Sequence, residues 1–202
     1  MTDITAKQVL NFIEEIGKLK TISRTGWRFH GIIGDTESIS DHCYRVSLLA
    51  MLLGDVLVEH DVKLDMDKVM RMALLHEIGE ARIGDIPFPA FRYIDEQYKS
   101  KAEQKAVDEM LNNLGQIGRR YFSLWREFEE RSSLEGRLVR AADKLELMIQ
   151  VYQYEKVGYR DLDLFWTNSW NMQEFDLHEF IEEIMQALVE KRNNLFAERN
   201  RK

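Results

Sequence analysis

Only two prolines occur among the 202 residues of this chain, and they stand close together at positions 87 and 89. Proline interrupts helices because its ring fixes φ and removes a backbone donor. Apart from this one segment, little in the sequence stops a helix. Apolar residues make up 45% of the chain, a share typical of a globular protein with a buried core. The sequence therefore favours an all-α fold of long helices.

Apolar residues recur at helical spacing through most of the chain. We predict helices over 4–20, 38–57, 67–81, 95–114, 119–131, 132–158 and 177–197. Ser38 with Asp41 and Ser132 with Glu135 match capping patterns for two of these helices. The glycine-rich segment 21–37 lacks the period and is predicted to be an extended loop. We expect one domain over 1–202, a bundle of six or seven helices with its core over about 38–158.

Charge and cysteine content exclude several classes of partner. The formal net charge of −7 leaves no broad basic surface, so we expect no nucleic-acid polymer as partner. Cys43 is the single cysteine, which rules out an internal disulfide and fits a reducing cytoplasm. The N-terminal residues lack a signal pattern, and no run of about 18 apolar residues is present. We therefore expect a cytoplasmic protein without a membrane partner.

Several histidines and acids fall on apolar helix faces. His42 begins the leucine-rich helix, His76 follows buried positions of its own helix with Glu77 and Glu80 beside it, and Asp143 interrupts an apolar stretch. Each residue alone fits ordinary core packing or a solvent-facing acid. Together they fit a metal site built from facing helices. Both interpretations remain open from the residues alone.

Two other chemical interpretations fail on spacing. The zinc-protease motif needs a second histidine one turn after the first, and this chain has Glu80 there. Cys43 next to His42 is not a nucleophile pair, because adjacent helical residues point about 100° apart.

Five short strings occur in a fixed order, at 24–27 (RTGW), 37–42 (ESISDH), 74–81 (LLHEIGEA), 84–87 (GDIP) and 142–146 (ADKLE). On these strings the chain resembles the HD-domain metal-dependent phosphohydrolases, and specifically their 5′-deoxynucleotidase branch. The likeness covers about residues 10–160. It implies metal-dependent hydrolysis of a deoxynucleoside 5′-monophosphate to deoxynucleoside and phosphate, and it also implies a homodimer.

The resemblance assigns a metal-binding role to four residues. His42, His76, Glu77 and Asp143 would hold one divalent cation, which would be Mn, Co, Mg or Zn. Such a cation polarises a phosphoryl oxygen and lowers the pKa of a bound water.

The resemblance also assigns roles around the substrate. Glu80 corresponds to a general acid or base, and Asp85 to an acid that reads the 2′ position of the sugar. Arg24 corresponds to a phosphate-binding arginine. Trp27 either flanks the nucleoside or anchors its loop. We also expect Pro87 and its neighbour Pro89 to stiffen the segment that holds Asp85, the alternative being a plain turn between helices.

One departure concerns the residue after His76, where the family has aspartate and this chain has Glu77. The extra methylene lengthens the side chain by about 1.3 Å, a large change against metal–oxygen distances of about 2.0–2.2 Å. Glu77 either ligates from a helix that has moved back or binds through water. We favour direct ligation by Glu77, because all the other residues that the resemblance assigns to the site are present in this chain.

Two further functions stay open. The metal site could serve another phosphorylated small molecule, a nucleoside triphosphate or a phosphodiester. The chain could instead be a helical interaction module with an impaired metal site, using Trp166 and Trp170 as a partner surface.

Overall fold

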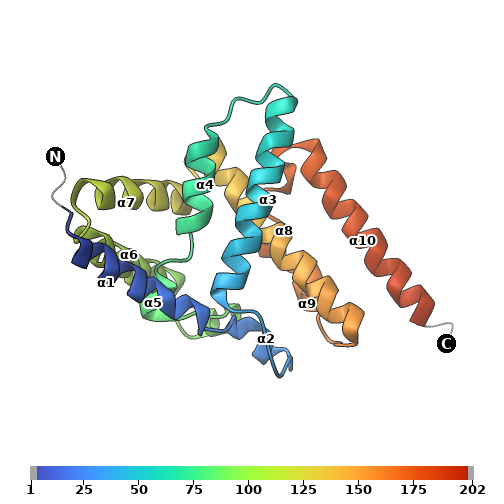
Figure 1. The fold of residues 1–202 in the computed structure, drawn as a ribbon. Coiled ribbons are helices and arrows are strands. Elements are labelled where there is room, and N and C mark those ends of the chain that lie inside the picture. Colours follow the sequence, from blue (N-terminus) through green and yellow to red (C-terminus); the bar gives the residue numbers. More distant parts are fainter. Residues whose placement is uncertain (1–3, 200–202) are drawn as a thin grey trace.

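The computed structural model describes residues 4–199, which form ten α-helices and four short 3₁₀ helices (Figure 1). The long helices are α1 (Ala6–Ile16), α3 (Ile39–Glu59), α4 (Met66–Leu75), α6 (Glu96–Asn112), α7 (Gly115–Glu130), α8 (Leu134–Val157) and α10 (Glu179–Arg199). The short elements are η1 (Gly17–Lys20), α2 (Thr25–Phe29), α5 (Glu80–Ile83), η2 (Phe88–Arg92), α9 (Asp163–Thr167), η3 (Ser169–Met172) and η4 (Phe175–Leu177). The predicted all-α bundle is confirmed, and its seven long helices match the predicted number.

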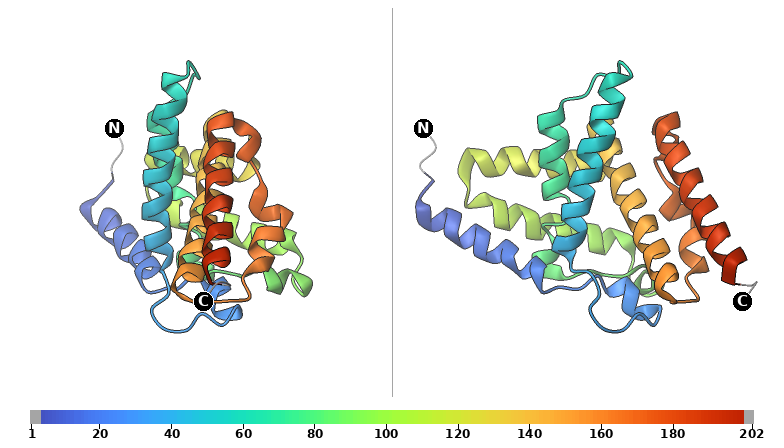
Figure 2. Two further views of the ribbon diagram at one scale, coloured as in Figure 1. Left: turned by 90° about the vertical axis from the view of Figure 1, so that its right-hand side faces the viewer. Right: turned by 45° about the vertical axis from the view of Figure 1, so that its right-hand side comes forward.

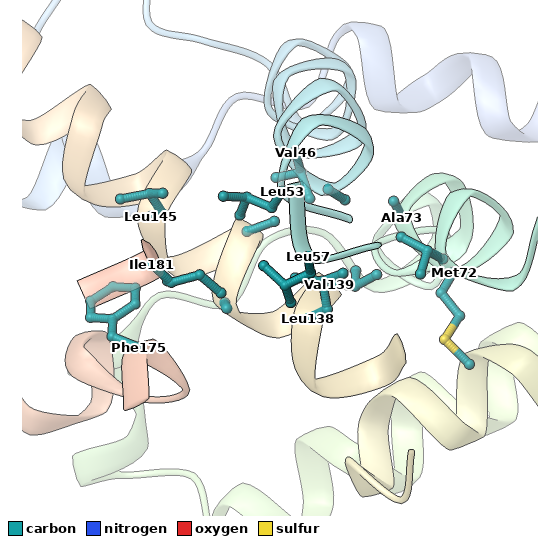
Figure 3. Packing of buried hydrophobic residues seen from close by; sticks show 14 of the residues in the cluster. Val46, Leu53, Leu57, Met72, Ala73, Leu138, Val139, Leu145, Phe175 and Ile181 are labelled. Atoms are coloured by element: carbon teal, nitrogen blue, oxygen red, sulfur yellow. The ribbon is translucent and has the colours of Figure 1, made fainter. Parts of the chain in front are cut away.

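Helices α3 and α4 stand between two groups of helices. Figure 2 shows α1, α6 and α7 on one side of this pair and α8, α9 and α10 on the other. Helix α8 packs against α3, α4, α7 and α10. The main core lies where these helices meet, and Figure 3 shows Leu57 of α3 beside Leu138 and Val139 of α8. The middle of α8 is therefore buried, and any polar group there needs a partner.

The beginnings of two helices test the capping predictions. Ser38 and Asp41 form the predicted box, since the Ser38 hydroxyl accepts from the Asp41 amide at 3.1 Å and the Asp41 carboxylate accepts from the Ser38 amide at 2.8 Å. The prediction for α8 was wrong by one residue. Its cap is Ser133, which accepts from the Gly136 amide at 3.1 Å. The box at Ser38 fixes the start of α3 and so places His42 in its first turn.

The predicted helix 67–81 is wrong in its last part, because α4 ends at Leu75 and residues 76–79 form a turn. In this turn the amides of Ile78 and Glu80 donate to carbonyl groups only three residues back, those of Leu75 and Glu77. Ile78 remains buried, so the apolar residues keep their helical spacing through the turn, and the sequence does not reveal that the helix ends at Leu75. The turn presents His76 and Glu77 at the end of α4 instead of along its side.

Two other boundaries differ from the sequence prediction. The segment 21–37 contains the five-residue helix α2, which is too short to show a helical period. Gly115, predicted as a stop, has a φ of 55° and is instead the first residue of α7, which two residues separate from the end of α6 at Asn112. Within residues 4–199, no helix is both long enough and apolar enough to cross a membrane.

Candidate metal centre

Four side chains from three parts of the fold converge on one point. His42 comes from α3, His76 and Glu77 from the turn after α4, and Asp143 from the middle of α8. One ligand atom of each lies within 4.8 Å of the others. His42, His76 and Asp143 are buried, and Glu77 is half-buried. The structure thus brings together all four residues that the resemblance nominated.

The separations between these atoms fit a single cation. Nε2 of His42 lies 3.2 Å from Oδ1 of Asp143 and 3.5 Å from Nε2 of His76. Oε1 of Glu77 lies 4.0 Å from Nε2 of His42 and 3.8 Å from Nε2 of His76. Two atoms bound to one ion at about 2.0–2.2 Å lie roughly 2.9–4.4 Å apart, depending on the angle between them. The longer Glu77 side chain therefore reaches a position that is compatible with direct ligation.

Both histidines are held with Nε2 toward the centre. Nδ1 of His42 lies 2.5 Å from Oε2 of Glu146, and Nδ1 of His76 lies 2.8 Å from the carbonyl oxygen of Ala73. Carbonyl and carboxylate oxygens accept, so each Nδ1–H donates, and each Nε2 is the ring nitrogen that would bind a cation once it carries no proton. Partners of this kind fix the tautomer and orientation of metal-binding histidines. The donor set is that of a metal centre.

The charges of the centre attract a cation. Burial and the Arg24 charge lower the pKa of His42, but hydrogen bonds to Asp143 and Glu146 outweigh them and raise it to about 9. Burial raises the pKa of Asp143, yet the charges of Lys144 and His42 hold it well below the usual range. The ionised carboxylates therefore favour a positive charge at their centre, which is a proton on His42 in the metal-free protein and which a bound divalent cation would replace.

A cleft of about 960 Å³ lies beside this centre, and Arg24 and Trp27 line it. Nη1 of Arg24 lies 3.6 Å from Oε1 of Glu77, and Nε of Arg24 lies 3.9 Å from Oε1 of Glu37. Glu37 also accepts from Nε1 of Trp27 at 2.9 Å. The Trp27 ring is buried against Tyr154, with ring centroids 5.0 Å apart. The segment before α3 is therefore anchored by Trp27 while it holds Arg24 beside the centre.

Glu80 and Asp85 line the same cleft. Glu80 is buried, and its Oε2 atom has no hydrogen-bond partner in the described residues. Burial, followed by the charges of Glu77 and Asp85, raises the pKa of Glu80 well above its ordinary value, which favours the protonated carboxyl. Oδ2 of Asp85 accepts from the amide of Thr25 at 2.5 Å and from its hydroxyl at 2.9 Å. Thr25 therefore fixes the Asp85 carboxylate at the cleft wall.

Several residues of the centre were not singled out by sequence reasoning. Glu146 lies three residues after Asp143 in the string 142–146, and this helical spacing to a proposed ligand was the signal for it. Lys144 and Arg140 lie 3.4 and 3.5 Å from Oδ2 of Asp143 and line the cleft. Glu103 from α6 gave no signal, because an acid within a helix usually faces solvent.

The two tryptophans proposed as a partner surface have different surroundings. Trp170 is part of the cleft wall, with the Arg131 guanidinium 5.6 Å from its ring centroid. Trp166 is half-buried, and the Arg192 guanidinium lies 4.7 Å from its ring centroid. Of the two, only Trp170 is exposed.

Residues 16–185 match the model of the HD domain. The chain therefore belongs to the HD domain family, as its five strings implied. It is 39% identical over 150 residues to the 5′-deoxynucleotidase HDDC2 of Dictyostelium discoideum, covering 73% of this chain and 77% of that protein. It is 31% identical over 198 residues to the 5′-deoxynucleotidase HDDC2 of Xenopus laevis, covering 96% and 92% of the two chains.

Solved structures share the same fold. A conserved hypothetical protein from Pyrococcus furiosus is 36% identical, with a TM-score of 0.75 over 88% of this chain and 99% of that one. A predicted metal-dependent phosphohydrolase from Magnetospirillum magnetotacticum has a TM-score of 0.73 over 96% and 95% of the two chains. Because the identity to this second protein is only 23%, the match shows that the two chains share a fold and nothing more.

Proposed function

We propose that this chain is a metal-dependent 5′-deoxynucleotidase, which hydrolyses deoxynucleoside 5′-monophosphates to deoxynucleoside and phosphate. The observation that carries the proposal is the convergence of His42, His76, Glu77 and Asp143 beside a cleft. Relatives that cover most of the chain at 30–39% identity carry the name 5′-deoxynucleotidase. In this proposal the metal centre carries out the hydrolysis, and residues of the cleft wall determine which substrate binds.

The donor set of two imidazoles and two carboxylates suits a borderline or hard divalent cation, so Mn²⁺, Co²⁺, Mg²⁺ and Zn²⁺ are the candidates. A cation bound there polarises the phosphoryl group and activates water for attack. The chain itself holds the two imidazoles in the ligating orientation through Glu146 and the Ala73 carbonyl.

Arg24 binds the phosphate in this proposal. Its guanidinium lies 3.6 and 3.9 Å from the nearest carboxylate oxygens of Glu77 and Glu37, too far for strong hydrogen bonds to either. The planar donors are therefore available for a phosphate, which arginine binds through two parallel hydrogen bonds. The carboxylates keep the guanidinium in place before the substrate arrives.

Glu80 provides the proton for the leaving group. The raised pKa of its buried carboxyl favours the protonated form, and Oε2 has no competing partner in the described residues. When the bond from phosphorus to the 5′-oxygen breaks, Glu80 donates to that oxygen, and the resulting carboxylate takes a proton from the attacking water.

Asp85 limits the substrate at the 2′ position of the sugar. Two hydrogen bonds from Thr25 hold its Oδ2 atom, so the carboxylate cannot turn away from the cleft without losing them. A fixed side chain at this place favours the smaller deoxyribose over ribose. Pro87 and Pro89, which also line the cleft, would restrict the backbone on the other side of Asp85.

Phosphate release by the purified protein tests the proposal. After removal of bound metal, the protein is supplied with Mn²⁺, Co²⁺, Mg²⁺ or Zn²⁺ and with matched deoxynucleoside and ribonucleoside monophosphates. We expect faster release from the deoxynucleotides, and loss of both bound metal and release in His42→Ala and Asp143→Ala. No release with any of these metals contradicts the proposed function. Release only from nucleoside triphosphates or phosphodiesters would assign the centre to another substrate.

We also propose that residues 1–202 form one domain and that two chains pair as a homodimer. Support comes from α3, where Tyr44, Leu48 and Leu52 are exposed and follow one another at four-residue spacing on one face. Light scattering on the purified protein is expected to give twice the mass of the chain. Leu48→Glu is expected to give single chains.

A further inference from the structure

We propose that Arg45 is a positioning residue of the metal centre, which acts on the ligand His42 through Glu146. Arg45 follows His42 by three residues on α3, so the two side chains lie on the same side of that helix. From this place the Arg45 guanidinium reaches α8. Its expected effect on turnover rests on the proposed function, whereas its effect on metal binding does not.

The two carboxylate oxygens of Glu146 have different neighbours. Oε2 lies 2.5 Å from Nδ1 of His42. Oε1 has no aligned hydrogen bond in the described residues, and Nη1 of Arg45 lies 3.2 Å from it. Because Glu146 is fully buried, water cannot offset the charge of its carboxylate. The charge of Arg45 takes the place of water at this oxygen.

The Arg45 guanidinium is itself held against α8. Its Nη1 donates to Oε1 of Gln150 at 2.5 Å and to Oε1 of Gln153 at 3.3 Å. Glu146, Gln150 and Gln153 are four and three residues apart, so they line one face of α8. The Arg45 side chain is only 30% exposed. Its charge is therefore fixed beside Glu146 and does not move freely in solvent.

A second carboxylate lies next to Glu146. One oxygen of Glu37 is within 4.8 Å of the Glu146 carboxylate and of the His42 ring. Two carboxylates at this distance repel each other, which would move Glu146 away from His42. Nε of Arg24 lies 3.9 Å from Oε1 of Glu37, but Arg24 is assigned to the phosphate. Arg45 offsets the charge of Glu146 without engaging Arg24.

These contacts connect a partly exposed arginine to a metal ligand. Arg45 stabilises the Glu146 carboxylate, Glu146 accepts from Nδ1 of His42, and Nε2 of His42 faces the centre. Partners of this kind orient a ligating histidine and make it a stronger ligand. Loss of Arg45 leaves a buried charge unbalanced, so His42 is expected to be held less firmly and to bind a cation more weakly.

Calorimetric titration of the metal-free protein with Mn²⁺ tests this role without relying on activity. We expect Arg45→Met to weaken Mn²⁺ binding about fivefold, less than the roughly tenfold effect of removing a direct partner of a ligand, because Arg45 is one contact further away. Arg45→Lys keeps a charge near Oε1 of Glu146 and is expected to bind Mn²⁺ as the wild type does. Arg71→Met is the matched control, because Arg71 has a similarly exposed side chain and pairs with Asp67 on α4.

A double variant separates positioning from general damage to the fold. Glu146→Gln has no carboxylate charge to offset, so the addition of Arg45→Met is expected to cause no further loss of Mn²⁺ affinity. Losses that multiply in the double variant would mean that the two residues act independently, and they overturn the proposal. Equal losses in Arg45→Met and Arg45→Lys overturn it as well, as does unchanged Mn²⁺ binding in Arg45→Met. If circular dichroism shows that Arg45→Met does not fold, Arg45→Gln takes its place in the same comparison.

Phosphate release distinguishes this role from the proposed function. Because Arg45 acts only through the metal, saturating Mn²⁺ is expected to return kcat and KM of Arg45→Met for a deoxynucleotide to the wild-type values. A kcat that stays low at saturating Mn²⁺ overturns the positioning role. The expected Mn²⁺ constants in a protein that releases no phosphate support the role of Arg45 and contradict only the proposed function.

Discussion

Nδ1 of His42 lies 2.5 Å from Oε2 of Glu146, and both residues are fully buried. The contact joins α3 to α8 and turns Nε2 of His42 toward Asp143, His76 and Glu77. It therefore connects the packing of the two helices to the geometry of the metal centre.

Replacing Glu146 tests this connection. Glu146→Gln keeps an acceptor for Nδ1–H but removes the charge that makes the imidazole a stronger ligand. The affinity of the metal centre for Mn²⁺ is expected to fall about tenfold. This is the lower end of the range observed when a residue that hydrogen-bonds to a metal ligand is replaced. Glu155→Gln is the control, because Glu155 is buried on the same helix but binds Arg192 instead. Equal Mn²⁺ constants for Glu146→Gln and the wild type would show that Glu146 does not support the centre.

Shortening Glu77 tests its role as a ligand. Glu77→Asp restores the residue usual in the family but withdraws the carboxylate by about 1.3 Å. The turn 76–79 positions the longer side chain, so Mn²⁺ is expected to bind more weakly to Glu77→Asp than to the wild type. Calorimetry on metal-free protein measures this. Tighter binding by the aspartate variant would mean that Glu77 does not ligate directly.

Arg24→Lys tests the phosphate-binding role. Lysine keeps the charge beside Glu77 but loses the planar pair of donors. We expect kcat/KM for a deoxynucleotide to fall about 10- to 100-fold, the equivalent of a lost charged hydrogen bond, mostly through KM. Mn²⁺ binding should stay near that of the wild type. Arg28→Lys is the control, because Arg28 is an exposed residue of helix α2, which begins directly after Arg24. An unchanged KM in Arg24→Lys would remove Arg24 from the phosphate site.

Asp85→Asn and Thr25→Val test the discrimination of the sugar. Asp85→Asn removes the carboxylate charge, and Thr25→Val removes the hydroxyl that donates to this carboxylate. Both variants are expected to discriminate less between the sugars, so kcat/KM for a deoxynucleotide divided by kcat/KM for the ribonucleotide should fall. The larger fall is expected in Asp85→Asn. Pro87→Ala probes the backbone in the same assay. An unchanged ratio in Pro87→Ala would indicate that the proline only forms a turn, and an unchanged ratio in Asp85→Asn would contradict the role of Asp85.

Gly118→Ala tests the packing of α7 on the end of α6. A Cβ atom there would lie 1.9 Å from the carbonyl oxygen of Leu111, so the backbone has to move. We expect the free energy of unfolding to fall by about 1–3 kcal/mol, measured by denaturant titration. Gly17→Ala is the control, because no atom lies within 4 Å of its added Cβ. If Gly118→Ala is as stable as the wild type, the contact between α7 and the end of α6 can adjust to an added methyl group without cost.

The sequence alone predicted the helical class, most helix positions and, through the family resemblance, the four candidate metal ligands that the structure brings together. Proline scarcity and the apolar period are local properties of the sequence. They predict helices because residues three and four positions apart lie on the same face of a helix. The start of α3 at Ser38 was predictable for the same reason. His42, His76 and Asp143 stood out because polar groups on apolar faces need partners.

The tertiary structure decided which groups meet. Apolar spacing did not reveal that the chain leaves α4 at Leu75, because Ile78 stays buried through the turn. Contacts between distant residues, such as Glu146 with His42 and Glu103 with Glu80, depend on how α8 and α6 pack. Helix packing is set by side-chain shape over whole surfaces, as at Gly79 and Gly118. For that reason the sequence nominated the candidate metal ligands, while only the packed structure placed the residues that orient them and the acids beside them.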